Sequence, residues 1–256
     1  MKLVERIASL VESGGRGVLF TVVAGDGIGG KLLVPEDGEP FGDGPPDLAA
    51  HAAELQRGAR NRLVELDGRT VFAEVYGPAP RLFAYGAVDT AEALCRAARL
   101  LGWRTIVADA RGAFATRERI PSADELLVAW PEEAYAQVRP DHQTAIVVLT
   151  HDDKFDEPAL RGALETEAFY VGALGSRRNQ EKRRARLLEA GVPEEALARI
   201  AGPCGLDIGA ESQEETALSI LAEILAVRAK RPGGRLQDAK RRIHAQEDAP
   251  APSPAA

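Results

Sequence analysis

The chain has 256 residues, 45% of them apolar, enough for one large domain or about two ordinary ones with a proper core. Its formal net charge of -7 argues against a general nucleic-acid-binding surface, and no apolar run approaches the ~20 residues of a membrane helix. The first residues lack the features of a signal peptide, so we expect a cytoplasmic protein with no nucleic-acid or membrane partner. Cys95 and Cys204 fit no zinc-ligand spacing and are expected to be reduced.

Residues 1–78 have the pattern of a small α+β domain. The expected elements are a helix over 2–12, strands over 18–23 and 31–34, a helix over 48–55, and a hairpin of 62–66 with 70–75. Asp67 and Gly68 favour the hairpin because an Asp-Gly pair readily supplies the positive φ of a two-residue turn. Residues 35–46 are rich in proline and glycine and are predicted to be irregular, and residues 77–80 have the composition of a linker.

From Arg81 onward, strand-like apolar runs alternate with helical stretches. The predicted strands cover 82–85, 105–108, 126–130, 145–149 and 168–171. This alternation predicts an α/β fold over 79–229, a Rossmann-like doubly wound parallel sheet. In the strand order 3-2-1-4-5, the first and fourth strands are neighbours, so the loop at Gly86 would face the loop at His151. Residues 230–256 lack periodicity and are expected to form a disordered tail.

The first candidate site follows the first strand of this sheet. Gly86 opens a turn into a helix, and Asp109 ends the next strand, where a dinucleotide-binding fold keeps its ribose-binding acid. Val88 and Ala91 stand where the second and third glycines of that motif would be. Because Val88 places a branched side chain where the backbone should approach a pyrophosphate, NAD(P) binding would be weakened.

The second candidate is the polar string that follows the fourth strand, His151, Asp152, Asp153 and Asp156. Imidazole and carboxylate groups in a crevice can bind a divalent cation or transfer a proton. Helix capping is the other interpretation, since Asp152 or Asp153 can accept backbone N–H groups and Asp156 suits the positive end of a helix. Capping does not account for His151.

The third candidate follows the fifth strand. Gly172 and Gly175 lie in a turn that leads through Ser176 into a basic helix, whose first turn carries Arg177 and Arg178. Cations are unfavourable at a helix N-terminus unless an anion binds there, so this placement favours a bound phosphate or carboxylate. Farther along, Arg178, Lys182 and Arg186 share one helical face, which is more often a solvated stripe than a site.

The fourth candidate is the glycine-punctuated segment 202–209, just before the last helix. Asp207 is a candidate ligand, and Cys204 is a candidate soft ligand for a metal or sulfur. Equally, these glycines can simply allow a buried loop to bend.

Taken together, these motifs resemble the XdhC/CoxI family of accessory factors for xanthine dehydrogenase and related molybdenum hydroxylases. The resemblance covers residues 81–228 and rests on three strings and the helix after them: THD at 150–152, YVGALGSRR at 170–178, and GLDIGA at 205–210 followed by ETALSILAEILAVR. It implies a protein that binds molybdenum cofactor (molybdopterin), helps its sulfuration and delivers it to the apo-enzyme. Whether the chain is an enzyme stays open, with a cofactor chaperone favoured.

The resemblance also implies partners and contacts. The partners would be an apo molybdenum hydroxylase and a cysteine desulfurase, with a homodimer as a further expectation. The residues expected to contact the cofactor are Gly86, Asp109, His151, Asp152, Gly172, Gly175, Ser176, Arg177, Arg178 and Asp207. The phosphate end would meet Ser176 and the two arginines after it, while the pterin end would lie near Gly86 and His151.

The N-terminal domain departs from the family pattern. The family has a cysteine in a glycine-rich stretch, and residues 41–47 here contain none. Either Cys204 substitutes for it, or a partner chain supplies it, or this member carries no cofactor. Two alternative functions remain: an NAD(P)-dependent oxidoreductase and a nucleotide-binding regulator.

Overall fold

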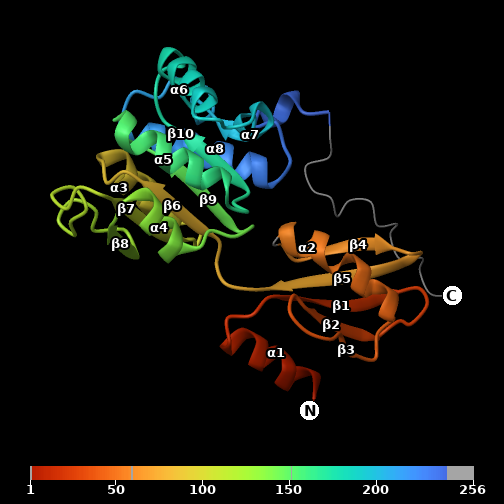
Figure 1. Cartoon of the computed structure of the whole chain (residues 1–256). Helices are drawn as coiled ribbons and strands as arrows, with labels where there is room; N and C mark the ends of the chain where they lie inside the picture. The colour runs from red at the N-terminus through yellow and green to blue at the C-terminus, as the bar shows by residue number, and fades with distance from the viewer. Residues whose placement is uncertain (1, 59, 151, 241–256) are drawn as a thin grey trace. The chain divides into compact units, whose positions relative to one another are not determined.

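A computed structural model describes residues 2–58, 60–150 and 152–240 of the chain. The chain divides into two compact units, one formed mainly by residues 2–78 and the other by Ala79–Gly233. Figure 1 labels most of the helices and strands of the two units. Of the predicted tail, residues 241–256 lie outside the described part, and the single helical turn η2 (Leu236–Asp238) precedes them. Among the described helices, none combines the length and apolar character that a membrane crossing needs.

The first unit is built on a five-stranded antiparallel sheet in the order β3-β2-β1-β5-β4. Its core contains Val18 and Phe20 of the central strand, packed with Leu48 and Leu55 from the helical segment beside it. The elements are α1 (Leu3–Glu12), β1 (Gly17–Ala24), β2 (Lys31–Pro35), β3 (Phe41–Gly42), η1 (Pro46–His51), α2 (Ala52–Gly58), β4 (Arg62–Leu66) and β5 (Arg69–Tyr76).

Two connections in the first unit, the β4–β5 turn and the segment 35–46, can be compared with the sequence predictions. The expected hairpin is confirmed: Asp67 and Gly68 join β4 to β5 with φ values of 50° and 77°. The prediction that residues 35–46 are irregular throughout is wrong, because β3 pairs with β2. Gly42 allows this pairing, since a Cβ there would lie 2.0 Å from the Lys31 carbonyl oxygen.

The second unit is a six-stranded parallel sheet in the order β11-β10-β9-β6-β7-β8. This is the predicted 3-2-1-4-5 order with one more strand at the edge, so the doubly wound fold is confirmed. The elements are β6 (Arg81–Tyr85), α3 (Asp89–Arg99), β7 (Arg104–Asp109), β8 (Glu125–Val128), α4 (Pro131–Val138), β9 (Thr144–Val148), α5 (Asp153–Leu164), β10 (Tyr170–Ala173), α6 (Arg177–Glu189), α7 (Glu194–Leu197), β11 (Ile200–Ala201) and α8 (Gln213–Arg228).

The sheet has a separate apolar core on each face. Alternate residues of β6 point to opposite sides, so Leu82 and Ala84 pack with α3 and α8. Phe83 and Tyr85 pack with α4, α5 and α6 on the other side. The central strands β6 and β9 are therefore covered on both faces, and ligands can reach them only at their ends.

Two strand boundaries differ from the sequence prediction. The fifth strand is Tyr170–Ala173 rather than 168–171, because its ladder with β9 begins at the Tyr170–Ala145 pair. Gly172 therefore lies inside the strand. The third strand ends at Val128, because Trp130 is already the N-cap of α4 and Pro131 its first residue.

Candidate functional site

The carboxyl edge of the second sheet brings together the loops that the sequence singles out. Backbone hydrogen bonds continue from strand to strand beyond the ladders. Gly86 N donates to Ala108 O (2.7 Å), Leu149 N to Tyr85 O (2.8 Å), and Leu174 N to Val148 O (2.9 Å). The turns after β6, β9 and β10 therefore lie along one rim, as predicted for the loops near residues 86, 151 and 175. His151 lies outside the described residues.

Gly86 is required by close packing. Its φ is +117°, and a Cβ there would lie 3.0 Å from both the backbone nitrogen and Cγ2 of Thr150. The glycine thus allows the loop after β6 to touch the end of β9. Val88 follows as the N-cap of α3 in extended conformation, with no side-chain cap.

Asp109 is almost completely buried, with 1% of its surface exposed. Its carboxylate accepts hydrogen bonds from Ala87 N (2.9 Å), and from Arg111 through N (2.9 Å), Nε (2.9 Å) and Nη2 (2.8 Å). Burial alone would raise the pKa of Asp109, but the bonds from Arg111 and Ala87 outweigh it and hold that pKa below its ordinary value. The carboxylate thus ties the loop after β6 to the end of β7.

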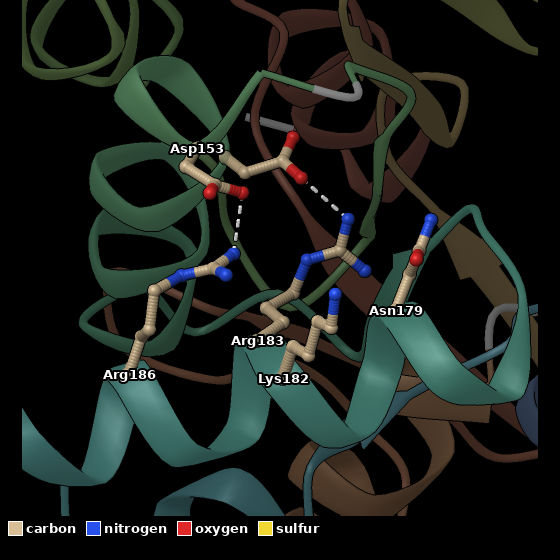
Figure 2. Close-up of a pocket in the computed structure, with 6 residues that line it drawn as sticks. Asp153, Asn179, Lys182, Arg183 and Arg186 are labelled. Carbon is tan, nitrogen blue, oxygen red and sulfur yellow. Dashed lines mark hydrogen bonds and ion pairs between the residues drawn. The ribbon is translucent and has the colours of Figure 1, made fainter.

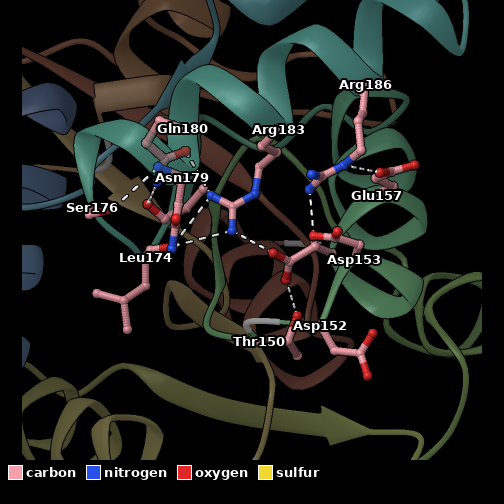
Figure 3. Close-up of polar contacts among 12 residues, drawn as sticks. Thr150, Asp152, Asp153, Glu157, Leu174, Ser176, Asn179, Gln180, Arg183 and Arg186 are labelled. Atoms are coloured by element: carbon pink, nitrogen blue, oxygen red, sulfur yellow. Dashed lines mark hydrogen bonds and ion pairs between the residues drawn. The ribbon is translucent and has the colours of Figure 1, made fainter.

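The aspartates after β9 have three different roles (Figure 3). Asp152 is the N-cap of α5, and its Oδ1 accepts a hydrogen bond from Lys154 N at 3.0 Å. Asp153 forms an ion pair with Arg186 on α6. Asp156 is buried, and accepts hydrogen bonds from the Thr150 hydroxyl and the Arg183 guanidinium. Capping therefore describes Asp152, whereas the other two join α5 to α6 or to the strand end.

The two glycines around the end of β10 serve different purposes. A Cβ on Gly172 would lie 2.7 Å from the Tyr170 ring and 3.0 Å from the Cys204 Cβ, so this residue is a packing glycine within the sheet. Gly175 has a φ of +136°, which L side chains rarely adopt, and it forms the turn into α6. Only Gly175 lies in the loop where a ligand can approach.

The first turn of α6 carries two exposed cations. Ser176 is the N-cap, with its hydroxyl accepting from Asn179 N at 3.3 Å. Arg177 and Arg178 follow, and the structure shows no ion pair for either within residues 152–240 or the other described ranges. Positive charge at the positive end of a helix costs about 0.3–1 kcal/mol for each group unless an anion compensates it.

Arg183 is a residue that the sequence analysis missed. Its side chain is 5% exposed, and it donates to Asp156, to Gln180 Oε1 (2.7 Å) and to Leu174 O (3.3 Å from both terminal nitrogens). The sequence carries one signal for the burial of Arg183: the apolar Leu187 lies four residues farther on the same helical face. The structure shows that both residues are buried. Arg183 holds the turn that begins α6 against α5.

The predicted solvated stripe on α6 is wrong for Arg186. Its side chain is 31% exposed and pairs with both Asp153 and Glu157 of α5. The two helices are therefore joined by a buried ion pair and a partly exposed one (Figure 3).

The segment after β11 contains both Cys204 and Asp207, and the two side chains have different surroundings. Cys204 is a free, buried thiol whose pKa burial raises to about 12, so it is protonated at neutral pH. Cys95, in the core, is also free, as the sequence predicts. Asp207 is exposed, and none of the hydrogen bonds seen in the described residues joins it to the other candidates. Within the same ranges, no group of three or more His, Cys, Asp or Glu side chains is placed to hold a metal ion.

The strand order and this rim define a Rossmann-type α/β domain in which a helix with two exposed arginines in its first turn begins at the carboxyl edge of the sheet. Residues 82–224 match the XdhC Rossmann domain, and the chain belongs to this family. The resemblance seen in the sequence motifs is therefore confirmed.

Two curated relatives and one solved structure illustrate what this chain is similar to. A probable xanthine dehydrogenase subunit of Bacillus subtilis (strain 168) is 33% identical over 199 residues, 77% of this chain and 57% of that protein. The "molybdenum cofactor insertion chaperone PaoD" of Escherichia coli (strain K12) is 32% identical over 153 residues, 60% of this chain and 42% of that protein. A crystal structure of a xanthine dehydrogenase from Bacillus halodurans is 25% identical with a TM-score of 0.65, covering 88% of this chain and 66% of that one. The chain thus spans about half the length of these curated relatives.

Proposed function

We propose that this protein binds molybdenum cofactor and helps deliver it to a molybdenum hydroxylase such as xanthine dehydrogenase. The observation that carries the proposal is the start of α6, where Arg177 and Arg178 are exposed at a helix N-terminus. Molybdopterin carries a phosphate, and helix N-termini with nearby arginines bind phosphate well. The family match and the names of the relatives support this assignment.

The residues of the rim fit the phosphate end of this cargo better than its metal end. Gly175 has no side chain to block the approach of a ligand, and the first backbone N–H groups of α6 are available beside the two arginines. Gly86 and Asp152 lie at the same rim and are proposed to border the pterin end, together with His151 and Asp207 as weaker candidates. Cys204 is neutral and buried, so binding rests on the anionic end of the molecule.

The oxidoreductase alternative needs Asp109 to receive a ribose hydroxyl. That carboxylate already accepts four hydrogen bonds from Ala87 and Arg111, and it is buried. Titration with NADH and NADPH tests this alternative, and we expect no saturable binding in the micromolar range. A nucleotide-binding regulator would bind a nucleotide yet leave the maturation of a molybdenum hydroxylase unchanged.

The proposed partners follow from the same function. Delivery requires docking to an apo molybdenum hydroxylase, and sulfuration would involve a cysteine desulfurase. We further propose that the protein acts in the cytoplasm and forms a homodimer. A second copy has the same residues 41–47 without a cysteine, so a cysteine ligand of that kind would have to come from a different chain.

Equilibrium binding of molybdenum cofactor tests the proposed anchor. Arg177→Ala and Arg178→Ala should each weaken binding about tenfold, because each removes a charge-assisted hydrogen bond to phosphate. Arg184→Gln is the matched control, since it removes one exposed cation of the same helix that pairs with Glu194. Equal affinities for all four proteins would remove the anchor.

A cellular measurement tests the delivery step. A molybdenum hydroxylase purified from cells lacking this protein should contain less sulfurated cofactor than the same enzyme from the parent cells. Full cofactor content in both preparations would contradict the delivery role.

A further inference from the structure

A cleft of about 180 Å³ lies between α5 and α6, beside the helix start that carries the proposed anchor but without Arg177 or Arg178 in its lining. Its walls come from the two helices that the ion pairs join (Figure 2). The lining residues are Asp153, Asp156, Asn179, Lys182, Arg183 and Arg186. Such a space is large enough for several water molecules or one tetrahedral anion.

Arg183 has an unused donor in this lining. The residue is 4% exposed, and its two terminal nitrogens donate to Asp156, Gln180 and Leu174. Its Nε, however, has no hydrogen-bond partner among the described residues. A buried N–H of a charged group that lacks an acceptor costs about 1–3 kcal/mol or more, so an acceptor that entered the cleft and reached this nitrogen would be stabilising.

The acidic residues of the lining do not supply that acceptor. Asp156 uses one carboxylate oxygen for the Thr150 hydroxyl and the other for Arg183. Asp153 and Glu157 are both paired with Arg186. The two arginines therefore compensate two of these three negative charges, and Glu157 is not part of the lining.

The remaining donors belong to two exposed side chains of α6. Lys182 has no ion pair, and the side-chain amide of Asn179 has no hydrogen bond, in the part of the chain that the structure describes. Figure 2 shows Asn179, Lys182 and Arg183 rising from neighbouring positions of α6 toward the loop before α5. The residues that line the cleft thus carry an ammonium, an amide and a guanidinium N–H without a bound acceptor.

We propose that this cleft binds a tetrahedral oxyanion group of the phosphate class, with Arg183 Nε, Lys182 Nζ and Asn179 Nδ2 as its donors. The proposal rests on the proposed function and deepens it, because the backbone N–H of Asn179 donates to Ser176, the N-cap beside the proposed anchor. The anion is either free phosphate or a second phosphoryl group of a bound cofactor. Both sources present the same oxygens to the same donors.

Thermal unfolding of the full chain at increasing inorganic phosphate, at constant ionic strength, measures the site. A ligand that binds only the folded state raises the unfolding temperature with its concentration, so the dependence gives a Kd even for a variant of different basal stability. Lys182→Gln and Asn179→Ala should each weaken phosphate binding, Lys182→Gln by about tenfold because it removes a charged donor. Arg184→Gln, which removes a neighbouring exposed cation, should keep the wild-type Kd.

The other outcomes of this experiment distinguish the cleft from the helix start and free phosphate from a cofactor phosphoryl group. If the wild type shows no phosphate-dependent stabilisation, or if Lys182→Gln and Asn179→Ala both keep its Kd, the cleft holds water only and the inference is overturned. Loss of phosphate binding in Arg177→Ala alone would place the anion at the helix start. That result would overturn the proposal that the cleft binds the anion, and it would leave the proposed function intact. A Lys182→Gln variant that loses phosphate but binds molybdenum cofactor normally would identify free phosphate as the ligand, and a loss of both would identify a phosphoryl group of the cofactor.

Discussion

Asp156 and Arg183 form an ion pair whose side chains are only 3% and 5% exposed. Asp156 lies in the first turn of α5 and Arg183 in the middle of α6, so the pair fixes the spacing of the two helices at the rim. The same guanidinium donates to Leu174 O, which holds the turn that leads to Ser176. The pair therefore holds in place both the helix start with the proposed anchor and the two helices that form the cleft.

Arg183→Met should destabilise the fold by about 3–5 kcal/mol, because it leaves the Asp156 carboxylate buried without its partner. Urea unfolding measures the change. The double variant Asp156→Leu with Arg183→Met should recover a large part of the loss, since it removes both charges together. Arg184→Gln, an exposed position on the same helix, should change stability by less than about 0.5 kcal/mol. A cost below about 1 kcal/mol for Arg183→Met would show that the pair contributes little.

Gly86→Ala should destabilise the fold more than Gly102→Ala. Both glycines have positive φ, +117° and +70°, so both variants carry backbone strain. Only at Gly86 would the new Cβ lie 3.0 Å from the backbone of Thr150, whereas at Gly102 nothing lies within 4 Å. We expect about 1 kcal/mol for Gly102→Ala and a larger cost for Gly86→Ala, measured by urea unfolding. Equal costs would mean that the loop after β6 moves away from β9 without penalty.

The architecture of the second unit could be predicted because its signals are local. Apolar runs of strand length alternate with helical stretches, and parallel connection rules then give the strand order. The short edge strand β11 gave no such signal, since Ile200 and Ala201 are two residues beside a four-residue helix. Its position depends on pairing with Val171 and Gly172 across a long connection.

The candidate site was harder to predict because its side chains are paired across elements. Whether Asp109 is open to a ligand depends on Arg111 folding back over it, and Arg111 is held there by stacking on Phe114 at 4.0 Å. Arg183 is one of several basic residues in its segment, and only contact with α5 distinguishes it from exposed neighbours such as Arg184. Residue type and spacing indicate the helix, but packing decides which cation is buried.

The lowered pKa of Asp109 predicts how stability depends on pH. A carboxyl whose folded-state pKa lies below the unfolded value of about 3.8 stabilises the fold above that value, and the contribution is lost as pH falls through the folded pKa. Unfolding free energies measured from pH 6 down to pH 3 should therefore fall less steeply for Asp109→Asn than for the wild type. Other carboxylates titrate in the same range, so the difference between the two curves is the quantity to compare. Parallel curves would show that Asp109 has no altered pKa in the folded protein.

Both cysteines should resist thiol reagents in the folded protein. Burial raises the pKa of Cys95 and of Cys204 to about 12, and the reactive thiolate is therefore scarce at pH 8. Labelling with a chromogenic disulfide at pH 8 should be slow in buffer and should reach two thiols per chain in 6 M urea. Cys204→Ala should in addition keep the affinity for molybdenum cofactor within about twofold, because the packed thiol does not contribute a ligand. Fast labelling of Cys204 in buffer, or a large loss of cofactor affinity in Cys204→Ala, would instead indicate that the segment opens and that the thiol takes part in binding.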